Sequence, residues 1–439
     1  MKKTLIPLAL LMTATLVVVA MVRDARQTTN AAVTAPPRSP VPGTSRAELT
    51  ETVEVMTARL AKKPDDGRAV VRLADALMRL QRVNNDGRAV ITAEEHLRRF
   101  LEVVPDHYEA QRTLAAVLLS QHRFRDAIAQ AESVRARDPR DAWNYGALGD
   151  GYLELGDYEK AFEAFDRMDQ LQPGPPSYAR AAYGLELQGD LDGALEQMRT
   201  ASDGTTPNDL ESQAWHFAQI GLLSLQKGRL VEAKLQFDHA SVTFPGHPSA
   251  IDGLAKIKVA EGDLASARQM LQGQLARVPT PDLAATIGDL SLDLGDASQA
   301  ERYFSMAEQI ERAAWGNGVR QPQVLARFLA EHERNLPEAV TLAEEAARTR
   351  KDIFTMDTLA WAYFKSGRLE DAKKASASAQ RTGSRDARIL YHAAEIQAAS
   401  GNAAEARRTL DRIPAPDAVA DVLIADGIKR LRSRLPHQP

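Results

Sequence analysis

The residues best suited to acid, base or metal chemistry are scattered along this chain and form no known motif. The sequence contains no cysteine, which excludes disulfides, thiolate metal sites and cysteine nucleophiles. None of its nine histidines pairs with another four residues away, as a zinc protease requires, and the closest two, His239 and His247, flank a turn at Pro245. It also contains no phosphate loop, no dinucleotide fingerprint and no glycine-flanked serine. We therefore predict no catalytic residue, no metal site and no cofactor.

Carboxylate side chains are plentiful, but they stand at repeated positions of the sequence. Asp157, Asp190, Asp263 and Asp296 each directly follow a glycine within a recurring phrase. Such aspartates are typical of turns and helix N-caps, whereas an active site needs a few singular groups with shifted acidities. We expect a protein that is not an enzyme, and an unfamiliar hydrolase site is the least favoured alternative.

The composition is that of a folded protein without a positive field. The 439 residues are 44% hydrophobic and 26% charged, which is enough for two or three ordinary domains. The 55 basic and 59 acidic residues give a formal net charge of -4. Because phosphate backbones are held by positive charge, we expect no nucleic-acid partner.

The first residues, 1–23, have the pattern of a targeting segment. Two lysines precede an apolar run over residues 5–22, which is at the lower limit of length for a membrane-spanning helix. Small residues near its end, Val18 and Ala20, favour cleavage as a signal peptide, whereas the length of the run favours retention as an inner-membrane anchor. Both alternatives place the remainder outside the cytoplasm, in the periplasm or the cell envelope, after a flexible proline-rich linker over residues 24–47.

A short phrase recurs through most of the remaining chain, in copies such as LGDYEKA, KGRLVEA and SGRLEDA. Its closing alanine returns at a nearly constant interval, and two longer intervals mark insertions around residues 204–207 and 315–321. The period of about 34 residues is typical of helical solenoids, in which each repeat is one supersecondary unit. The closing alanines are Ala93, Ala127, Ala161, Ala194, Ala233, Ala267, Ala300, Ala339, Ala372 and Ala406.

Positions at fixed distances from that alanine predict two antiparallel helices in each unit. Glycine stands five residues before it in seven units, where the first helix must end and the chain must reverse. A small residue such as Gly149 or Gly288 stands twelve before it in eight units, which allows two helix backbones to approach closely. Proline stands twelve after it in five units and closes the second helix. Apolar residues between these marks recur at helical spacing, and nothing alternates with period two.

The run AWNYGALGDGYLELGDYEKAFEAFDRMDQLQP, residues 142–173, resembles a tetratricopeptide repeat almost residue for residue. The resemblance extends over residues 68–413 and implies an all-α fold, a right-handed superhelical solenoid of about ten stacked helix-turn-helix units. The unit that closes on Ala339 departs most, since Arg327 replaces the small residue and Arg334 replaces the glycine. Parts of the chain also resemble exported bacterial repeat proteins of unassigned activity, which implies architecture but no chemistry.

The two ends of such a stack need covering, because a lone helical hairpin cannot bury its apolar face. We expect an N-terminal capping helix within residues 48–67, and a C-terminal capping helix and tail over residues 414–439. The first helix of each unit should line the concave side of the solenoid. That side is the default surface for binding a partner.

Residues 18, 15 and 11 before each closing alanine share one face of the first helix, which we interpret as concave. Aromatic side chains mixed with single charges on that face favour peptide binding, because aromatics supply binding energy and charges fix the register. The alternative is that these aromatics only pack one unit against the next. The candidate peptide-binding residues are Arg112, Trp143, Asp150, Arg180, Tyr183, Trp215, Lys256, Phe354, Trp361 and Tyr391.

Two further features bear on this groove. Arg180 stands fourteen before its alanine and beside Arg112, where it suits an acidic group. The asparagines with which tetratricopeptide co-chaperones hold a carboxyl terminus are missing from that column. Trp315 lies in an insertion, and its ring is either a loop plug or an exposed contact.

Together, these patterns predict a non-enzymatic protein–protein interaction scaffold of the bacterial cell envelope, whose concave groove binds segments of partner proteins. The alternative, by architectural analogy, is an accessory subunit of a polysaccharide-export or outer-membrane assembly machine in the envelope. The sequence does not identify the partner.

Overall fold

The computed structural model describes residues 45–84, 87–316, 320–415 and 418–436. Within these ranges the chain forms helices joined by short turns, and it contains no strand. The predicted signal or anchor segment and nearly all of the predicted linker lie outside the described residues. None of the described helices combines the length and the apolar character needed to cross a membrane.

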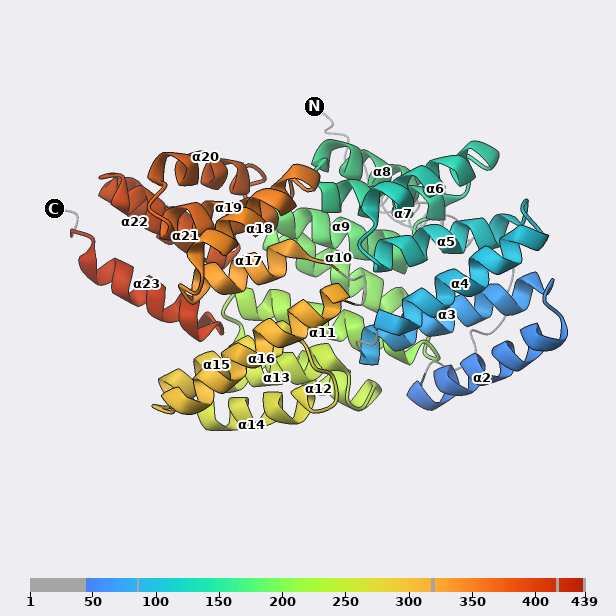
Figure 1. The fold of residues 1–439 in the computed structure, drawn as a ribbon, viewed down its shortest axis with the longest axis horizontal. Helices are drawn as coiled ribbons and strands as arrows, with labels where there is room; N and C mark the ends of the chain where they lie inside the picture. Colours follow the sequence, from blue (N-terminus) through green and yellow to red (C-terminus); the bar gives the residue numbers. More distant parts are fainter. Residues whose placement is uncertain (1–44, 85–86, 317–319, 416–417, 437–439) are drawn as a thin grey trace, which may run out of the picture. The chain divides into compact units, whose positions relative to one another are not determined.

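Twenty helices of the described part form ten consecutive hairpins, which confirms the predicted all-α stack (Figure 1). The two helices of each hairpin contact each other, and each hairpin contacts the next. The closing alanines all lie on second helices and are at most 1% exposed, since close packing leaves no space for a larger side chain. The hairpins are α3 (Gly67–Asn84) with α4 (Gly87–Val103), α5 (Tyr108–Ser120) with α6 (Phe124–Arg137), α7 (Ala142–Leu155) with α8 (Tyr158–Leu171), α9 (Pro175–Leu187) with α10 (Leu191–Gly204), α11 (Leu210–Gln226) with α12 (Leu230–Thr243), α13 (Pro248–Ala260) with α14 (Leu264–Leu275), α15 (Pro281–Asp293) with α16 (Ala297–Gly316), α17 (Pro322–Glu331) with α18 (Leu336–Thr349), α19 (Ile353–Lys365) with α20 (Leu369–Ala379), and α21 (Ala387–Ala399) with α22 (Ala403–Leu410).

The predicted turn glycines separate the first helix of a hairpin from the second. At the α7–α8 turn, Gly156 is in the left-handed region, and the backbone N–H of Asp157 donates to the carbonyl of Tyr152 at 2.9 Å. L residues with a side chain rarely adopt this conformation, which explains the choice of glycine. A φ between 71° and 82° is shared by Gly156, Gly189, Gly228, Gly262, Gly295, Gly367 and Gly401.

The small residues of the first helices make room for aromatic rings of the second helices. A Cβ atom placed on Gly149 would lie 2.3 Å from the ring of Phe165, and one on Gly288 would lie 2.4 Å from the ring of Phe304. Each of these rings stands four residues after a closing alanine. The missing side chain of the glycine therefore leaves space for the ring, and the two helices approach closely, as predicted.

The hairpin of α17 and α18 has no glycine at its turn, and the chain reverses there in a different way. The residues on either side of Arg334 adopt positive φ, Glu333 at 51° and Asn335 at 39°. The guanidinium of Arg334 forms ion pairs with Glu301 and Glu308 of the preceding hairpin, both at 2.8 Å. The chain reverses there at the cost of left-handed backbone in two residues that have side chains.

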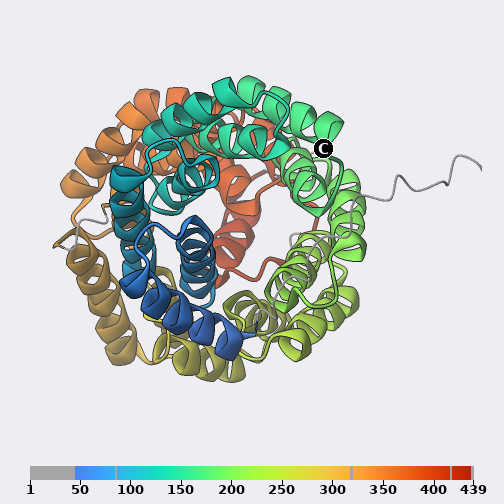
Figure 2. The same cartoon turned by 90° about the vertical axis from the view of Figure 1, so that its right-hand side faces the viewer.

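The hairpins wind around a common axis, so that hairpins far apart in sequence meet (Figure 2). Beside the α7–α8 turn, the backbone N–H of Lys351 donates to the carbonyl of Leu155 at 2.9 Å. Next to it, Arg350 forms an ion pair with Glu154 at 2.8 Å. A Cβ atom on Gly156 would lie only 2.4 Å from the backbone carbon of Lys351. The third hairpin thus rests directly on the start of the ninth.

The same contact repeats at the next two turns. A Cβ atom on Gly189 would lie 2.6 Å from the carbonyl oxygen of Gly383, and one on Gly228 would lie 2.8 Å from the Cβ of Ala415. Successive turns of the coil therefore touch at three consecutive hairpins. We call this row of contacts, made by residues 154–158, 189 and 228 against residues 350–353, 383 and 415, the seam.

A cluster of partly buried charges joins the beginning of the stack to its fifth hairpin. Arg82, at the end of α3, forms an ion pair with Glu211 of α11 at 2.7 Å, and Arg79 forms one with Asp209 at the same distance. The side chain of Glu211 is only 2% exposed. Because burying an ion is costly unless it is paired, these four groups depend on one another.

The two ends of the stack are covered by single helices. At the beginning, α2 (Arg46–Lys62) packs on α3 and starts with a capping box formed by Ser45 and Glu48. At the other end, α23 (Val422–Arg434) packs on α21 and also contacts α15. The last helix therefore follows the inner side of a hairpin that lies well before it in sequence.

Candidate binding cavity

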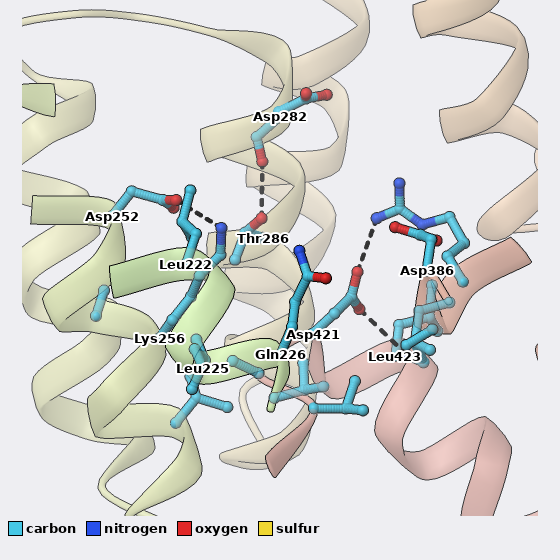
Figure 3. A pocket seen from close by; sticks show the side chains of 18 of the residues that line it. Leu222, Leu225, Gln226, Asp252, Lys256, Asp282, Thr286, Asp386, Asp421 and Leu423 are labelled. Atoms are coloured by element: carbon cyan, nitrogen blue, oxygen red, sulfur yellow. Dashed lines mark hydrogen bonds and ion pairs between the residues drawn. The ribbon is translucent and has the colours of Figure 1, made fainter. Parts of the chain in front are cut away.

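The first helices of several hairpins enclose a cavity of about 720 Å³ (Figure 3). Its walls come mainly from α11, α13, α15 and residues 413–415 and 418–424, with one or two residues each from α3, α9, α14, α17 and α21. All but one of these helices are first helices, which the repeat pattern places on the inner side, and the carboxyl-terminal segment completes the wall. The volume lies within the range of about 300–1,000 Å³ that is typical of ligand pockets.

The cavity combines apolar walls with charged side chains. Leu222 and Leu225 of α11 and Leu423 at the start of α23 supply apolar surface, and Gln226 and Asp421 lie on the walls of the same cavity (Figure 3). Apolar surface supplies binding energy, whereas a few placed polar groups fix the orientation of a ligand.

Most cations of the cavity are held by its own carboxylates. Lys256 and Asp252, one turn apart on α13, lie 2.6 Å from each other. On the next hairpins, Arg327 of α17 reaches Asp282 of α15 at 2.6 Å. Arg327 occupies the position at which most repeats have a small residue. Its ion pair with Asp282 therefore joins two hairpins across the cavity wall.

Arg388 is held from two sides. Its guanidinium lies 2.8 Å from Asp421 and 3.1 Å from Glu331. Burial by itself raises the pKa of the Asp421 carboxyl, but the charge and the hydrogen bond of Arg388 outweigh burial and lower that pKa below its ordinary value. Asp421 also accepts from the backbone N–H of Ile424 and so caps α23. The carboxyl-terminal segment is thereby tied to α21.

The electrostatic environment of Glu186 on α9 raises the pKa of its carboxyl, whereas that of Asp421 lowers the pKa. Its carboxylate accepts a hydrogen bond from the side-chain amide of Gln226 at 2.7 Å. Burial raises the pKa of Glu186, and the charge of Asp386 raises that pKa further, against the hydrogen bond of Gln226, which lowers it. Among the described residues, no cation forms an ion pair with this carboxylate.

Of the candidate residues predicted from the sequence, Lys256 lines this cavity. Its neighbours in the same columns of the repeat, Asp252 and Asp289, line it as well. The columns chosen from helical spacing therefore point inward at these hairpins. The assignment of a peptide-binding role to them stays a prediction.

The four candidates nearest the amino terminus lie in earlier hairpins and interact with one another or with neighbouring carboxylates. Arg112 reaches Asp141 at 2.8 Å and lies over the ring of Trp143. Arg180 forms two hydrogen bonds with Asp150, at 2.9 and 2.6 Å. Both arginines thus have internal acidic partners, so the acidic group that suits Arg180 belongs to this chain.

Four of the six candidate aromatics are either buried or exposed, and Trp143 and Trp215 are half-buried. Trp361 and Tyr391 are buried, and Trp361 stacks on His392 with ring centroids 3.8 Å apart. These two rings belong to the core of the last hairpins and present no surface to a partner. Tyr183 and Phe354, by contrast, are 36% and 43% exposed.

Trp215 and Trp315, the second of which was not a candidate, are also half-buried. Trp215 packs edge-on against His216 and against apolar residues of α9 and α10. Trp315 does not lie in a loop: it belongs to the last turn of α16, donates from its indole nitrogen to Glu311 at 2.8 Å, and lies under Arg320. Neither alternative for Trp315 describes it fully, because the ring lies on a helix instead of a loop and packs partly buried against the core instead of standing exposed.

Several residues of the cavity were not predicted from the sequence. Glu186, Asp386, Arg388 and Asp421 come from three parts of the chain that only the winding of the coil brings together. The spacing of α9 contained a weak signal, since Glu186 lies three residues after the predicted Tyr183 and on the same helix face. Arg388 stands eighteen residues before Ala406, in a column that we interpret as concave, but it was not among the candidates. For Asp386 and Asp421, the repeat pattern gave no signal.

Comparisons with known proteins agree with this architecture. A family model described as Tetratricopeptide repeat matches residues 118–184 and residues 363–425. Among curated proteins, the cellulose synthase operon protein C of Pseudomonas fluorescens (strain SBW25) is 24% identical over 221 residues. The match covers 49% of this chain but only 17% of that protein, so the chain corresponds to a small part of its relative.

Solved structures resemble the fold at low sequence identity. Human IFIT1, solved as a dimer with m7Gppp-AAAA, is 15% identical, with 77% of this chain and 78% of that chain covered and a TM-score of 0.50. PilW, described as a widely conserved type IV pilus biogenesis factor, is 20% identical, with 46% of this chain and 93% of that chain covered and a TM-score of 0.40. The first similarity concerns the fold alone, and the second is too loose to support an argument.

The family follows from three agreeing observations. The sequence repeats one phrase at a nearly constant interval, the structure stacks ten helical hairpins, and the family model matches within both halves of the chain. The chain is a tetratricopeptide repeat protein.

Proposed function

We propose that this protein is a non-enzymatic scaffold of the bacterial cell envelope that binds segments of partner proteins on the inner side of its coil. The observation that carries the proposal is the cavity of about 720 Å³, which is walled by first helices from at least six hairpins. A surface shared among many repeats is suited to an extended segment, because each hairpin adds its own contacts along the path.

The envelope location rests on the sequence of residues 1–23. The apolar run after two lysines directs the chain to the membrane, and the absence of cysteine from the sequence fits an exported protein without disulfides. The segment is either cleaved or kept as an anchor in the inner membrane. Mass measurement of the mature protein distinguishes the two.

The scaffold proposal is tested by photo-crosslinking in intact cells of the source bacterium. A photoreactive amino acid at Thr286, which lines the cavity, or at the exposed Tyr183 should capture specific proteins. The matched control carries the same amino acid at Val231, which is 87% exposed on the second helix α12. Equal capture from all three positions, or none from Thr286 and Tyr183, would contradict the proposal.

The second candidate is an accessory subunit of an envelope polysaccharide-export or outer-membrane assembly machine. The similarity to the cellulose synthase operon protein C favours it over other assemblies. In that case the chain should co-purify with a membrane complex after gentle detergent extraction. Recovery of the chain with soluble partners alone would favour the general scaffold.

Both candidates assume that the protein is not an enzyme. Turnover of model substrates by the purified protein, lost on mutation of a cavity carboxylate, would overturn that assumption.

A further inference from the structure

The charges that line the cavity do not balance. Seven carboxylates line it, against five cations from arginine and lysine. One of those cations, Arg82, is held by Glu211 outside the lining. Lys256, Arg327 and Arg388 are each paired with carboxylates of the cavity itself. The inner surface therefore has carboxylates in excess of the cations that can neutralise them.

The excess is located at Glu186 and Asp386. Neither forms an ion pair with a cation among the residues that the structure describes. They belong to α9 and to the N-cap of α21, and both line the cavity. The seam brings these two segments together, since a Cβ atom on Gly189, just after α9, would lie 2.6 Å from the carbonyl oxygen of Gly383, just before α21. Arg385 lines the cavity as well and forms no ion pair among the described residues, so it offsets one carboxylate without removing the excess of seven over five.

Two other groups, one in the lining of the cavity and one on α9, favour a donor or a cation in the ligand. Gln274 is only 5% exposed, lines the same cavity, and its side-chain oxygen accepts no hydrogen bond. A buried acceptor without a partner is costly, and a ligand donor relieves that cost. Tyr183 lies one turn before Glu186 on α9 with its ring partly exposed, and an aromatic face beside a carboxylate favours a guanidinium or an ammonium.

We propose that the cavity binds a basic segment of a partner protein and holds a lysine or arginine side chain between Glu186 and Asp386. This assignment rests on the proposed scaffold function and names the chemistry of the segment it takes. Leu222, Leu225 and Leu423 contact the apolar residues on either side of the cation. An acidic segment is disfavoured, because carboxylates exceed cations in the lining and because Lys256, Arg327 and Arg388 are already paired with internal carboxylates.

The proposal is tested with three short, labelled, amidated peptides and fluorescence anisotropy on the full chain. The first peptide alternates arginine with leucine and alanine, and the other two contain glutamine or glutamate in place of each arginine. We expect the arginine peptide to bind, the glutamine peptide to bind at least about tenfold more weakly, and the glutamate peptide to bind weakest. Free arginine and spermidine are used as competitors and should displace the peptide only weakly.

The variant that tests the site is the double substitution Glu186→Gln and Asp386→Asn. Both replacements keep the shape of the side chain, and asparagine still caps α21. We expect the variant to bind the arginine peptide at least about tenfold more weakly than the original protein.

The control variant, Glu51→Gln with Glu54→Gln, removes two negative charges from the exposed face of α2. Its affinity for the arginine peptide should be unchanged. Glu186→Gln alone, which leaves the cap of α21 untouched, should give part of the loss.

Four results would overturn the proposal. They are equal or tighter binding of the glutamate peptide, absence of binding by all three peptides, equal affinity of the cavity variant and the control, and displacement of the peptide by free arginine or spermidine at equal concentration. The last result would assign the site to a small amine. If photo-crosslinking still captures partners while any of these results is found, the scaffold function stands and only the basic segment is rejected.

Discussion

The turn glycines of the seam and those elsewhere in the coil look the same in sequence and have the same backbone conformation, but their surroundings differ. A Cβ atom on any of the three seam glycines would lie within 2.8 Å of an atom from the next turn of the coil. Around the other four glycines, a Cβ atom would meet nothing within 4 Å. The seam glycines are Gly156, Gly189 and Gly228, and the open ones are Gly262, Gly295, Gly367 and Gly401.

The difference teaches that one residue of the repeat serves two purposes. At every turn, glycine relieves the strain of a left-handed backbone, which is a local requirement. At the seam it also permits two turns of the coil to touch, which is a requirement of the tertiary structure. Substitutions that satisfy the first requirement and violate the second should separate the two.

The largest expected effect is a difference in unfolding free energy between the variants Gly156→Asn and Gly262→Asn. Asparagine tolerates the left-handed region better than other residues with a side chain, so Gly262→Asn should cost less than about 1 kcal/mol of unfolding free energy. Gly156→Asn introduces a Cβ atom 2.4 Å from the backbone of Lys351 and should cost about 2–3 kcal/mol more by overpacking. Chemical denaturation followed by circular dichroism measures both. Equal midpoints for the two variants would show that the seam is not closed in solution.

A smaller effect is expected from Arg350→Met, which removes the charged seam contact but keeps an apolar stem beside Phe124. Arg350 is 17% exposed and pairs with Glu154 at 2.8 Å and Asp352 at 3.0 Å. Losing these charge-assisted hydrogen bonds should cost about 1.5–3 kcal/mol.

The matched control for that variant is Arg320→Met. Arg320 pairs with Glu345 at the surface, where the two side chains are 45% and 38% exposed, and exposed pairs contribute roughly 0–1 kcal/mol. If the control loses as much stability as Arg350→Met, the seam has no special role in holding the coil.

The smallest effect is a dependence of stability on pH at the contact between α3 and α11. Burial by itself raises the pKa of Glu211, but the hydrogen bond of Arg82 and the charges of Arg82 and Arg79 outweigh burial and lower that pKa below 4.5. A lowered pKa in the folded protein gives stability that is present above the pKa of the unfolded chain and is lost as the pH falls through the folded value.

Denaturation midpoints at pH 7 and below pH 4 measure this dependence. In Glu211→Gln, the stability at pH 7 should be lower, and the further loss on acidification should be smaller than in the original protein. An unchanged pH profile in this variant would show that the cluster does not couple the beginning of the stack to its fifth hairpin.

The repeat pattern predicted the hairpins well because each hairpin is specified locally. The closing alanine, the turn glycine and the small residue act within a single repeat, and all ten hairpins formed where these marks predicted. Arg327 and Arg334 were correctly identified as departures. The structure shows that they form ion pairs with Asp282 and Glu301 of the preceding hairpin.

The candidate site was predicted less well, because helical spacing identifies a face but not what covers it. Lys256 lines the cavity as the column predicts, but Trp361, at the same position of another repeat, is buried against His392. The last hairpins are covered by α23 and by each other, whereas the sixth faces the open cavity. Equivalent positions of a repeat therefore differ in exposure along the coil.

The sequence by itself determined the helices, their pairing and the inner and outer faces of each hairpin, since these depend on contacts within one repeat or between neighbours. Only the tertiary structure decided how many hairpins make one turn, and thus that Gly156 meets Lys351 and that Glu186 and Asp386 line the same cavity. The physical reason is that small rotations between neighbouring hairpins accumulate along the stack. No single repeat encodes their sum, and the contacts between distant hairpins depend on it.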